Sequence, residues 1–99
     1  MALPYEDWKT EDADALLDAI VTLGSREEAS LFFRDLCTRR ELEEMSQRWR
    51  VVRMLNEGTP YREIAADVGT STATITRINQ WLHHGMGGYS AMLDKHSKG

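Results

Sequence analysis

The fold of this chain is decided by residues 61–80, YREIAADVGTSTATITRINQ. The apolar positions in this stretch fall into two pairs, four and three residues apart, each of which shares one face of a helix. These pairs are Ile64 with Val68 and Ile75 with Ile78. Gly69 separates them, at a position where a left-handed backbone turn favours glycine. Ser71 and Thr72 follow as candidate caps of the second helix. The spacing predicts a helix-turn-helix.

The front of the second helix in this motif is small and mostly polar. Such side chains let a helix enter the major groove of DNA and offer hydroxyls to phosphates and base edges. We therefore predict DNA contacts from Thr70, Ser71, Thr72, Ala73, Thr74 and Thr76. The alternative, a solvent-exposed helical hairpin that binds nothing, stays open at this level.

The net charge of −4 argues at first against a nucleic-acid partner, but the charges are unevenly distributed. Residues 1–35 hold three basic and nine acidic side chains, a local sum of −6, whereas residues 46–99 hold seven basic and four acidic ones, a sum of +3. The predicted motif lies in the positive part. Its modest charge predicts weak non-specific binding to DNA.

Helical signals continue along the whole chain, and they predict an all-α protein of about six helices in one 99-residue domain. Residues that can cap helices precede four of them: Thr10, Ser25, Thr38 and Thr59, the last with Pro60 in the first turn. Glycines predict where helices end, at Gly24, Gly58 and Gly85. The second helix is expected to bury Ala29, Phe32, Phe33 and Leu36, and a short last helix to run from Tyr89 to about Lys95.

The long third helix carries an arginine within its apolar stripe. The stripe consists of Leu42, Met45, Trp49, Val52 and Leu55. Arg48 falls inside it, and a buried charge without a partner is costly. Arg48 could pair with Glu44 one turn earlier, pair with a carboxylate of another helix, or line a small-molecule site. We favour the structural pairing.

The stretch from Leu36 to Leu82 resembles the tryptophan repressor superfamily, most closely its YerC/YecD-like branch. The strongest match is the string ATITR at residues 73–77, and REI at 62–64 and RWRVV at 48–52 match in kind and order. The resemblance implies an intertwined, all-helical homodimer that binds double-stranded DNA at a pseudo-palindromic operator. In a single domain, residues 9–57 would be dimerisation helices, 60–83 the helix-turn-helix unit and 88–95 the last helix. The resemblance also implies that Arg62 contacts a base.

In that family's best-known member, L-tryptophan is a corepressor, and the resemblance carries an effector pocket onto Thr38, Arg48, Arg77, Ile78 and Trp81. The first three match in kind. Ile78 replaces a glycine beside the indole, and Trp81 replaces a serine that helps to hold the amino group. We therefore expect that the chain does not respond to L-tryptophan and that its own side chains fill the pocket. Whether another small-molecule effector acts stays open.

Other functions have less support in the sequence. The negative net charge suits a helix-turn-helix-shaped protein-interaction module without DNA binding, which is the main alternative. We expect no enzyme activity and no cofactor, because no nucleophile–base pair, carboxylate dyad or phosphate loop is visible. We expect no metal site, because the adjacent His83 and His84 point about 100° apart on a helix. The single cysteine, the acidic N-terminus and the lack of a membrane-length apolar run predict a cytoplasmic protein with no membrane partner.

Overall fold

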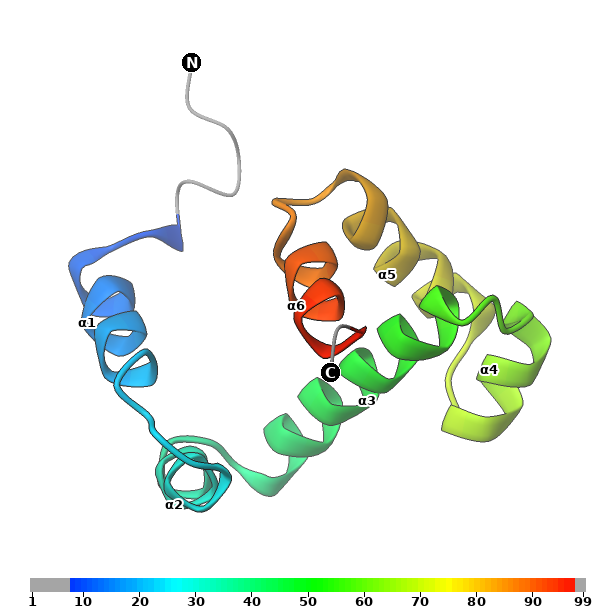
Figure 1. Cartoon of the computed structure of the whole chain (residues 1–99). Coiled ribbons are helices and arrows are strands. Elements are labelled where there is room, and N and C mark those ends of the chain that lie inside the picture. Colours follow the sequence, from blue (N-terminus) through cyan, green and yellow to red (C-terminus); the bar gives the residue numbers. More distant parts are fainter. Residues whose placement is uncertain (1–7, 98–99) are drawn as a thin grey trace. The chain divides into compact units, whose positions relative to one another are not determined.

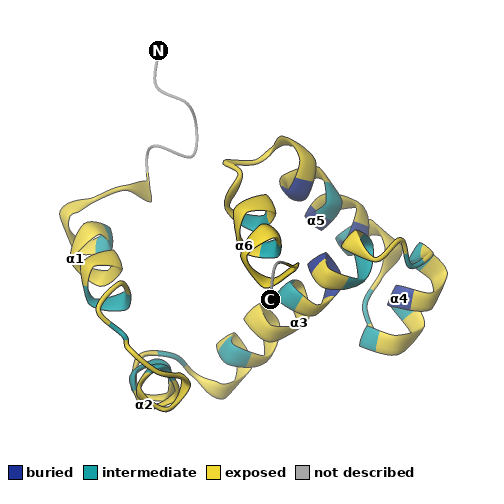
Figure 2. Ribbon diagram, in the orientation of Figure 1, coloured by how far each residue is buried: buried dark blue, intermediate teal, exposed yellow. Residues whose placement is uncertain are grey.

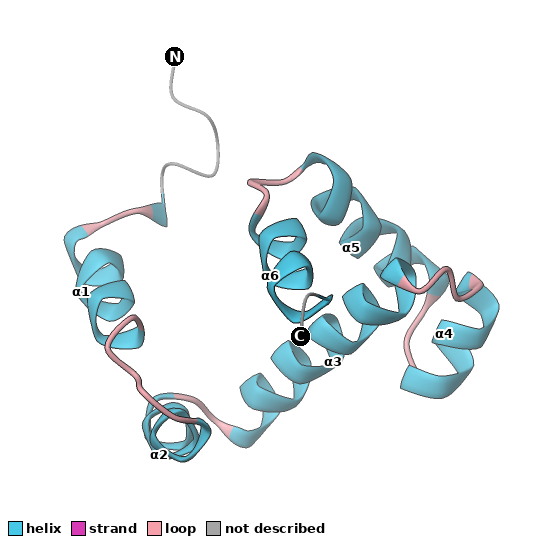
Figure 3. Cartoon of the chain, viewed as in Figure 1, coloured by secondary structure: helices cyan, strands magenta, loops and turns pink. Residues whose placement is uncertain are grey.

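A computed structural model of the chain describes residues 8–97, which consist of helices and the loops between them (Figure 3). The elements are α1 (Glu11–Ile20), α2 (Arg26–Leu36), α3 (Arg39–Asn56), α4 (Tyr61–Val68), α5 (Thr72–His84) and α6 (Gly88–Ser97), as labelled in Figure 1. The prediction of an all-α protein with about six helices is confirmed. Within the described residues, no helix is long and apolar enough to cross a membrane.

The described chain divides into two compact units between Arg39 and Arg40. The first unit holds α1 and α2, and the second holds α3 from Arg40 onward together with α4, α5 and α6. Within residues 8–97, every buried residue belongs to the second unit, as the dark blue segments of α3, α4 and α5 in Figure 2 show.

One apolar cluster forms the core of the second unit. Its buried members are Val51 and Val52 of α3, Ile64 of α4, and Ile75, Ile78 and Leu82 of α5. The spacing of the α5 residues, at 75, 78 and 82, keeps all three on one side of that helix. The α5 helix contacts both α4 and α6. This core therefore fixes α4 and α5 against α3 with the opposite side of α5 left in solvent.

The last helix is held by aromatic contacts with α3. The rings of Trp49 and Tyr89 are stacked, with centroids 6.4 Å apart and an interplanar angle of 29°. The ring of His96 lies 6.3 Å from Trp49 at a tilted angle. Ser90 adds a hydrogen bond from its hydroxyl to the Leu82 carbonyl at 3.5 Å. The last helix continues to Ser97, two residues beyond the predicted end.

The first unit confirms the predicted caps at Thr10 and Ser25 but not the predicted burial. Thr10 accepts a hydrogen bond from the Ala13 N–H at 3.1 Å, and Ser25 accepts one from Glu28 at the same distance. Neither α1 nor α2 contains a buried residue. Ala29, Phe32 and Phe33 are only half-buried, and Leu36 is 48% exposed. The prediction that α2 buries these four residues is wrong for the single chain, because two short helices have no further apolar layer of their own to cover them.

The ends of two helices also differ from the prediction. α1 ends at Ile20 rather than continuing toward Gly24, because the N–H and the hydroxyl of Thr22 both turn back to the Ala19 carbonyl. α4 is preceded by Pro60, which gives no side-chain cap, instead of being capped by Thr59.

Thr59 does not cap α4 because it takes part in the turn that closes α3. Gly58 has a φ of 81° and donates its N–H to Leu55, while the Thr59 N–H donates to Met54 at 3.0 Å. These two bonds are the paired closure that ends many helices at a glycine.

Candidate nucleic-acid interface

The turn between α4 and α5 is built on Gly69. Its backbone is left-handed, with φ 77° and ψ 38°, a conformation that costs glycine little. The N–H groups of Gly69 and Thr70 both donate to the Ala65 carbonyl, at 2.9 and 3.3 Å. The predicted glycine at the end of the first motif helix is confirmed, and the turn directs the chain into α5.

Ser71 begins α5 as its N-cap, and Thr72 is the first helical residue rather than a second cap. The Ser71 hydroxyl oxygen accepts a hydrogen bond from the Thr74 N–H at 3.1 Å. It also lies 3.0 Å from the Thr74 hydroxyl. Ser71 and Thr74 are thus joined by two hydrogen bonds at the start of the helix.

The predicted DNA contacts separate into two groups by exposure. Arg62, Ser71, Thr72, Ala73 and Thr76 are exposed. Thr70 and Thr74 are half-buried, and Thr70 lines a pocket toward α3. The exposed members on α5 lie on the side opposite its buried isoleucines, so they form one solvent face at the start of this helix.

The charge on α5 suits an anionic partner. None of its 13 residues is acidic. Arg77 is exposed one turn beyond Ala73. On α4, the exposed Arg62 is accompanied by two exposed acids, Glu63 and Asp67. Of these two helices, α5 has the outer face without acidic side chains, which suits a phosphate backbone better than the mixed charges of α4.

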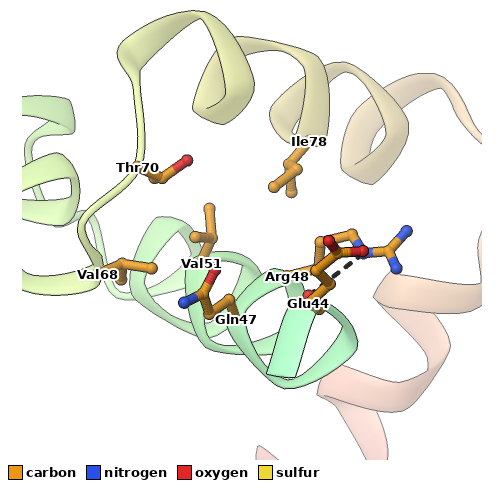
Figure 4. A pocket seen from close by; sticks show the side chains of 7 residues that line it. All are labelled: Glu44, Gln47, Arg48, Val51, Val68, Thr70 and Ile78. Atoms are coloured by element: carbon orange, nitrogen blue, oxygen red, sulfur yellow. Dashed lines mark hydrogen bonds between the residues drawn. The ribbon is translucent and has the colours of Figure 1, made fainter. Parts of the chain in front are cut away.

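A pocket of about 230 Å³ lies between α3, the turn and α5 (Figure 4). Its lining residues are Glu44, Gln47, Arg48 and Val51 from α3, Val68 and Thr70 from the end of α4 and the turn, and Ile78 from α5. Ile78 is only 2% exposed, and its side chain points from α5 into the space above α3. The α3 members follow helical spacing, at 44, 47, 48 and 51.

Arg48 is exposed, although the sequence places it in an apolar stripe. Its Nε donates to the backbone carbonyl of Glu44 at 3.4 Å. The Glu44 carboxylate lies instead 3.5 Å from Arg40 Nε, in an exposed i,i+4 ion pair. Of the alternatives predicted for Arg48, the ion pair with Glu44 does not form, because Arg48 contacts only the main chain of that residue, and Arg48 lines the pocket.

Of the five predicted pocket residues, the structure brings together only Arg48 and Ile78. Arg77 and Trp81 do not line this pocket, and Trp81 is 49% exposed. Each of these two residues directly precedes a buried residue of α5, and neighbours in a helix point about 100° apart. Thr38 belongs to the first unit.

Five lining residues were not predicted for this pocket: Glu44, Gln47, Val51, Val68 and Thr70. The helical spacing of the α3 members was a usable signal, because all of them share one side with Arg48. Nothing local indicated that Val68 and Thr70 would close the opposite wall, since their position depends on how α4 packs.

The three histidines lie in two different surroundings. The rings of His83 and His84 are 6.4 Å apart and tilted, while His96 lies against Trp49. No group of three potential metal-ligating side chains occurs in residues 8–97.

Comparisons with known proteins agree with this architecture. A model of the Trp repressor protein family matches residues 11–97. The Bacillus subtilis protein YerC, which is uncharacterized, is 41% identical over 85 residues, covering 86% of this chain and 82% of YerC. The crystal structure of a TrpR-like protein from Eubacterium eligens matches with a TM-score of 0.87 and 39% identity, covering 93% of this chain and 95% of that chain. A candidate Trp repressor from Staphylococcus aureus matches with a TM-score of 0.88 and 40% identity, covering 97% and 96%.

Proposed function

The chain belongs to the Trp repressor family, and on that premise we propose that it is a sequence-specific, DNA-binding transcriptional regulator. The observation that carries the proposal is the outer face of α5. This face is exposed and free of acidic side chains, while the opposite side of the helix is fixed by Ile75 and Ile78 in the core. A helix held in this way can enter a major groove without losing its own packing.

The small residues at the front of α5 would allow close approach to base edges. Thr72, Ala73 and Thr76 are exposed there. Arg62 at the start of α4 and Arg77 on α5 would supply positive charge to the phosphates or hydrogen bonds to a base.

The proposed active form is a homodimer. The first unit leaves large apolar side chains in solvent, with Leu16, Leu31 and Leu36 exposed by 36, 66 and 48%. Two helices without a buried residue gain little from folding alone. A second copy that covers this surface would remove it from water and would present two α5 helices to two half-sites of a pseudo-palindromic operator.

We further propose that the regulator does not respond to L-tryptophan. The Ile78 side chain, 2% exposed, forms a wall of the pocket between α3 and α5, where the resemblance places the indole ring. We expected Trp81 to help fill this pocket, but it does not line it. In the single chain, Ile78 is therefore the one of the two residues that can exclude the indole ring. Isothermal titration of the full chain with L-tryptophan should show no binding; micromolar affinity would overturn this part.

Selection of bound duplexes from a random pool tests the main proposal. The full chain should enrich an inverted repeat whose half-sites lie about 10 base pairs apart. The variant Thr76→Glu, which places a carboxylate on the outer face of α5, should lose this enrichment. Ala91→Glu, at an exposed position of α6, should retain it. Absence of enrichment by the unmodified chain would overturn the proposal.

One alternative has an observation in its favour. The net charge of −4, with Glu63 and Asp67 exposed on α4, suits a helix-turn-helix-shaped module that binds a protein and not DNA. The same selection separates the two functions, because such a module would enrich no duplex at any salt concentration.

A further inference from the structure

Three hydroxyl groups at the start of α5 already make hydrogen bonds within the protein. Those of Ser71 and Thr74 lie 3.0 Å apart, and the Ser71 oxygen also accepts the Thr74 N–H. The Thr76 hydroxyl donates to the Thr72 carbonyl at 2.9 Å, four residues earlier in the same helix. Its proton is therefore already used by the helix backbone.

This bond determines which group Thr76 turns outward. The Cβ of a threonine carries one hydroxyl and one methyl group. Because the hydroxyl of Thr76 is held against the helix wall and the residue is exposed, its outward chemistry is the Cγ2 methyl. The exposed Ala73 lies three residues earlier on the same face and presents a second methyl.

We infer that this face of α5 recognises thymine by its 5-methyl group, through Thr76 and Ala73. Thymine is the base that carries a methyl group in the major groove, and alanine and threonine methyls are suited to contact it. The inference rests on the proposed function, and it makes Thr76 a specificity-determining residue. The half-site should contain a thymine opposite these two side chains.

Deoxyuridine tests the inference directly, because it differs from thymine only by the missing methyl. In a duplex recovered by selection, each thymine is replaced singly by deoxyuridine, and Kd is measured for the full chain. We expect one position in each half-site where the replacement weakens binding about fourfold, the effect of one buried methyl. Replacements elsewhere should leave Kd unchanged.

Two variants of Thr76 assign the effect to its methyl. Thr76→Val keeps a methyl and removes the hydroxyl, so it should retain the preference for thymine over deoxyuridine. Thr76→Ser keeps the hydroxyl and removes the methyl, so it should reduce the preference for thymine to the part that the Ala73 methyl supplies. Thr22→Ser is the matched control, since the Thr22 hydroxyl, just past the end of α1, also donates to a backbone carbonyl, that of Ala19 at 2.7 Å. It should behave as the unmodified chain.

The outcomes separate this inference from the proposed function. Tight binding that no deoxyuridine weakens, or a recovered site without thymine, would overturn the inference and leave the proposed function standing. The same holds if Thr76→Val loses the preference and Thr76→Ser keeps it, because the hydroxyl would then be the reading group. If no duplex is bound at all, the proposed function fails first.

Discussion

The Ser71 Oγ accepts the Thr74 N–H at 3.1 Å, so the side chain that ends the turn also satisfies the first turn of α5. This single residue connects the geometry of the turn to the orientation of the helix that we propose enters the groove.

Removing this cap should weaken both folding and DNA binding. Ser71→Ala should lower the free energy of unfolding by about 1 kcal/mol, because the Thr74 N–H loses its acceptor. Urea denaturation at fixed protein concentration measures this loss. Ser25→Ala is the matched control, since Ser25 caps α2 with the same 3.1 Å bond. It should cost similar stability but leave the affinity for a selected duplex much less changed; equal losses of affinity would contradict a specific role for Ser71.

Gly69 should tolerate substitution poorly because its φ is 77°. Gly69→Ala should destabilise the protein by about 1–2 kcal/mol, the cost of a left-handed conformation for a residue with a Cβ. Gly24→Ala provides the comparison, because Gly24 lacks a positive φ and has open space around its Cα. Its unfolding free energy should stay the same or rise by up to about 1 kcal/mol. Equal losses at both positions would show that the conformation of the turn is not what selects glycine.

These two positions also show which features the sequence could predict. The glycine turn and the caps at Thr10, Ser25 and Ser71 were predictable because each depends on residues no more than four apart. Thr59 followed the same local pattern but is not the N-cap of α4, because it belongs to the closing turn of α3 and Pro60 takes the cap position. Two local patterns overlap at this residue, the closure of α3 and the cap of α4, and the structure forms the closure.

The pocket was predictable only in part, for a different reason. Arg48 and Ile78 come together because α3 and α5 pack through Val51, and no spacing within one helix could indicate the distance between two. Trp81 was expected in the pocket by resemblance, but its position just before Leu82 turns it away from the buried side of α5. The half-buried state of Thr70 likewise depends on tertiary packing.

Shortening Ile78 should open the pocket at a cost in stability. Ile78→Ala should destabilise the protein by about 2–5 kcal/mol and enlarge the space beside Val51, so L-tryptophan should bind this variant more tightly than the unmodified chain. Titration calorimetry measures the binding, and circular dichroism checks that the variant is folded. Where Ile78→Ala does not fold, the milder Ile78→Val serves.

The control for this experiment is Ile75→Ala. Ile75 is fully buried on the same helix but does not line the pocket. This variant should therefore lose comparable stability without gaining affinity for tryptophan. A gain in both variants would indicate general loosening of the core instead of an opened pocket.

Arg62 should contribute to sequence recognition at the start of the motif. If it binds a guanine edge bidentately, Arg62→Ala should cost about 1–3 kcal/mol on the selected duplex and relax the preference at one base pair. Arg62→Lys should recover little of this, because an ammonium group cannot make the planar two-bond contact. Arg26→Ala, an exposed arginine in the first unit, is the control. A small loss that is equal on all duplexes would assign Arg62 to the phosphates.

The exposed apolar surface of the first unit leads to a prediction about assembly. Leu16 and Leu17 of α1 remain 36 and 37% exposed, and neither α1 nor α2 buries a residue within its unit. If a second copy covers this surface, the thermal unfolding midpoint should rise with protein concentration, because folding and association are then coupled. Leu17→Asp should shift the chain to a monomer in sedimentation experiments and remove this concentration dependence, while Asp18→Asn, the adjacent exposed position, should not. A concentration-independent midpoint with a monomeric mass for the unmodified chain would rule out the homodimer, and with it the two-fold operator.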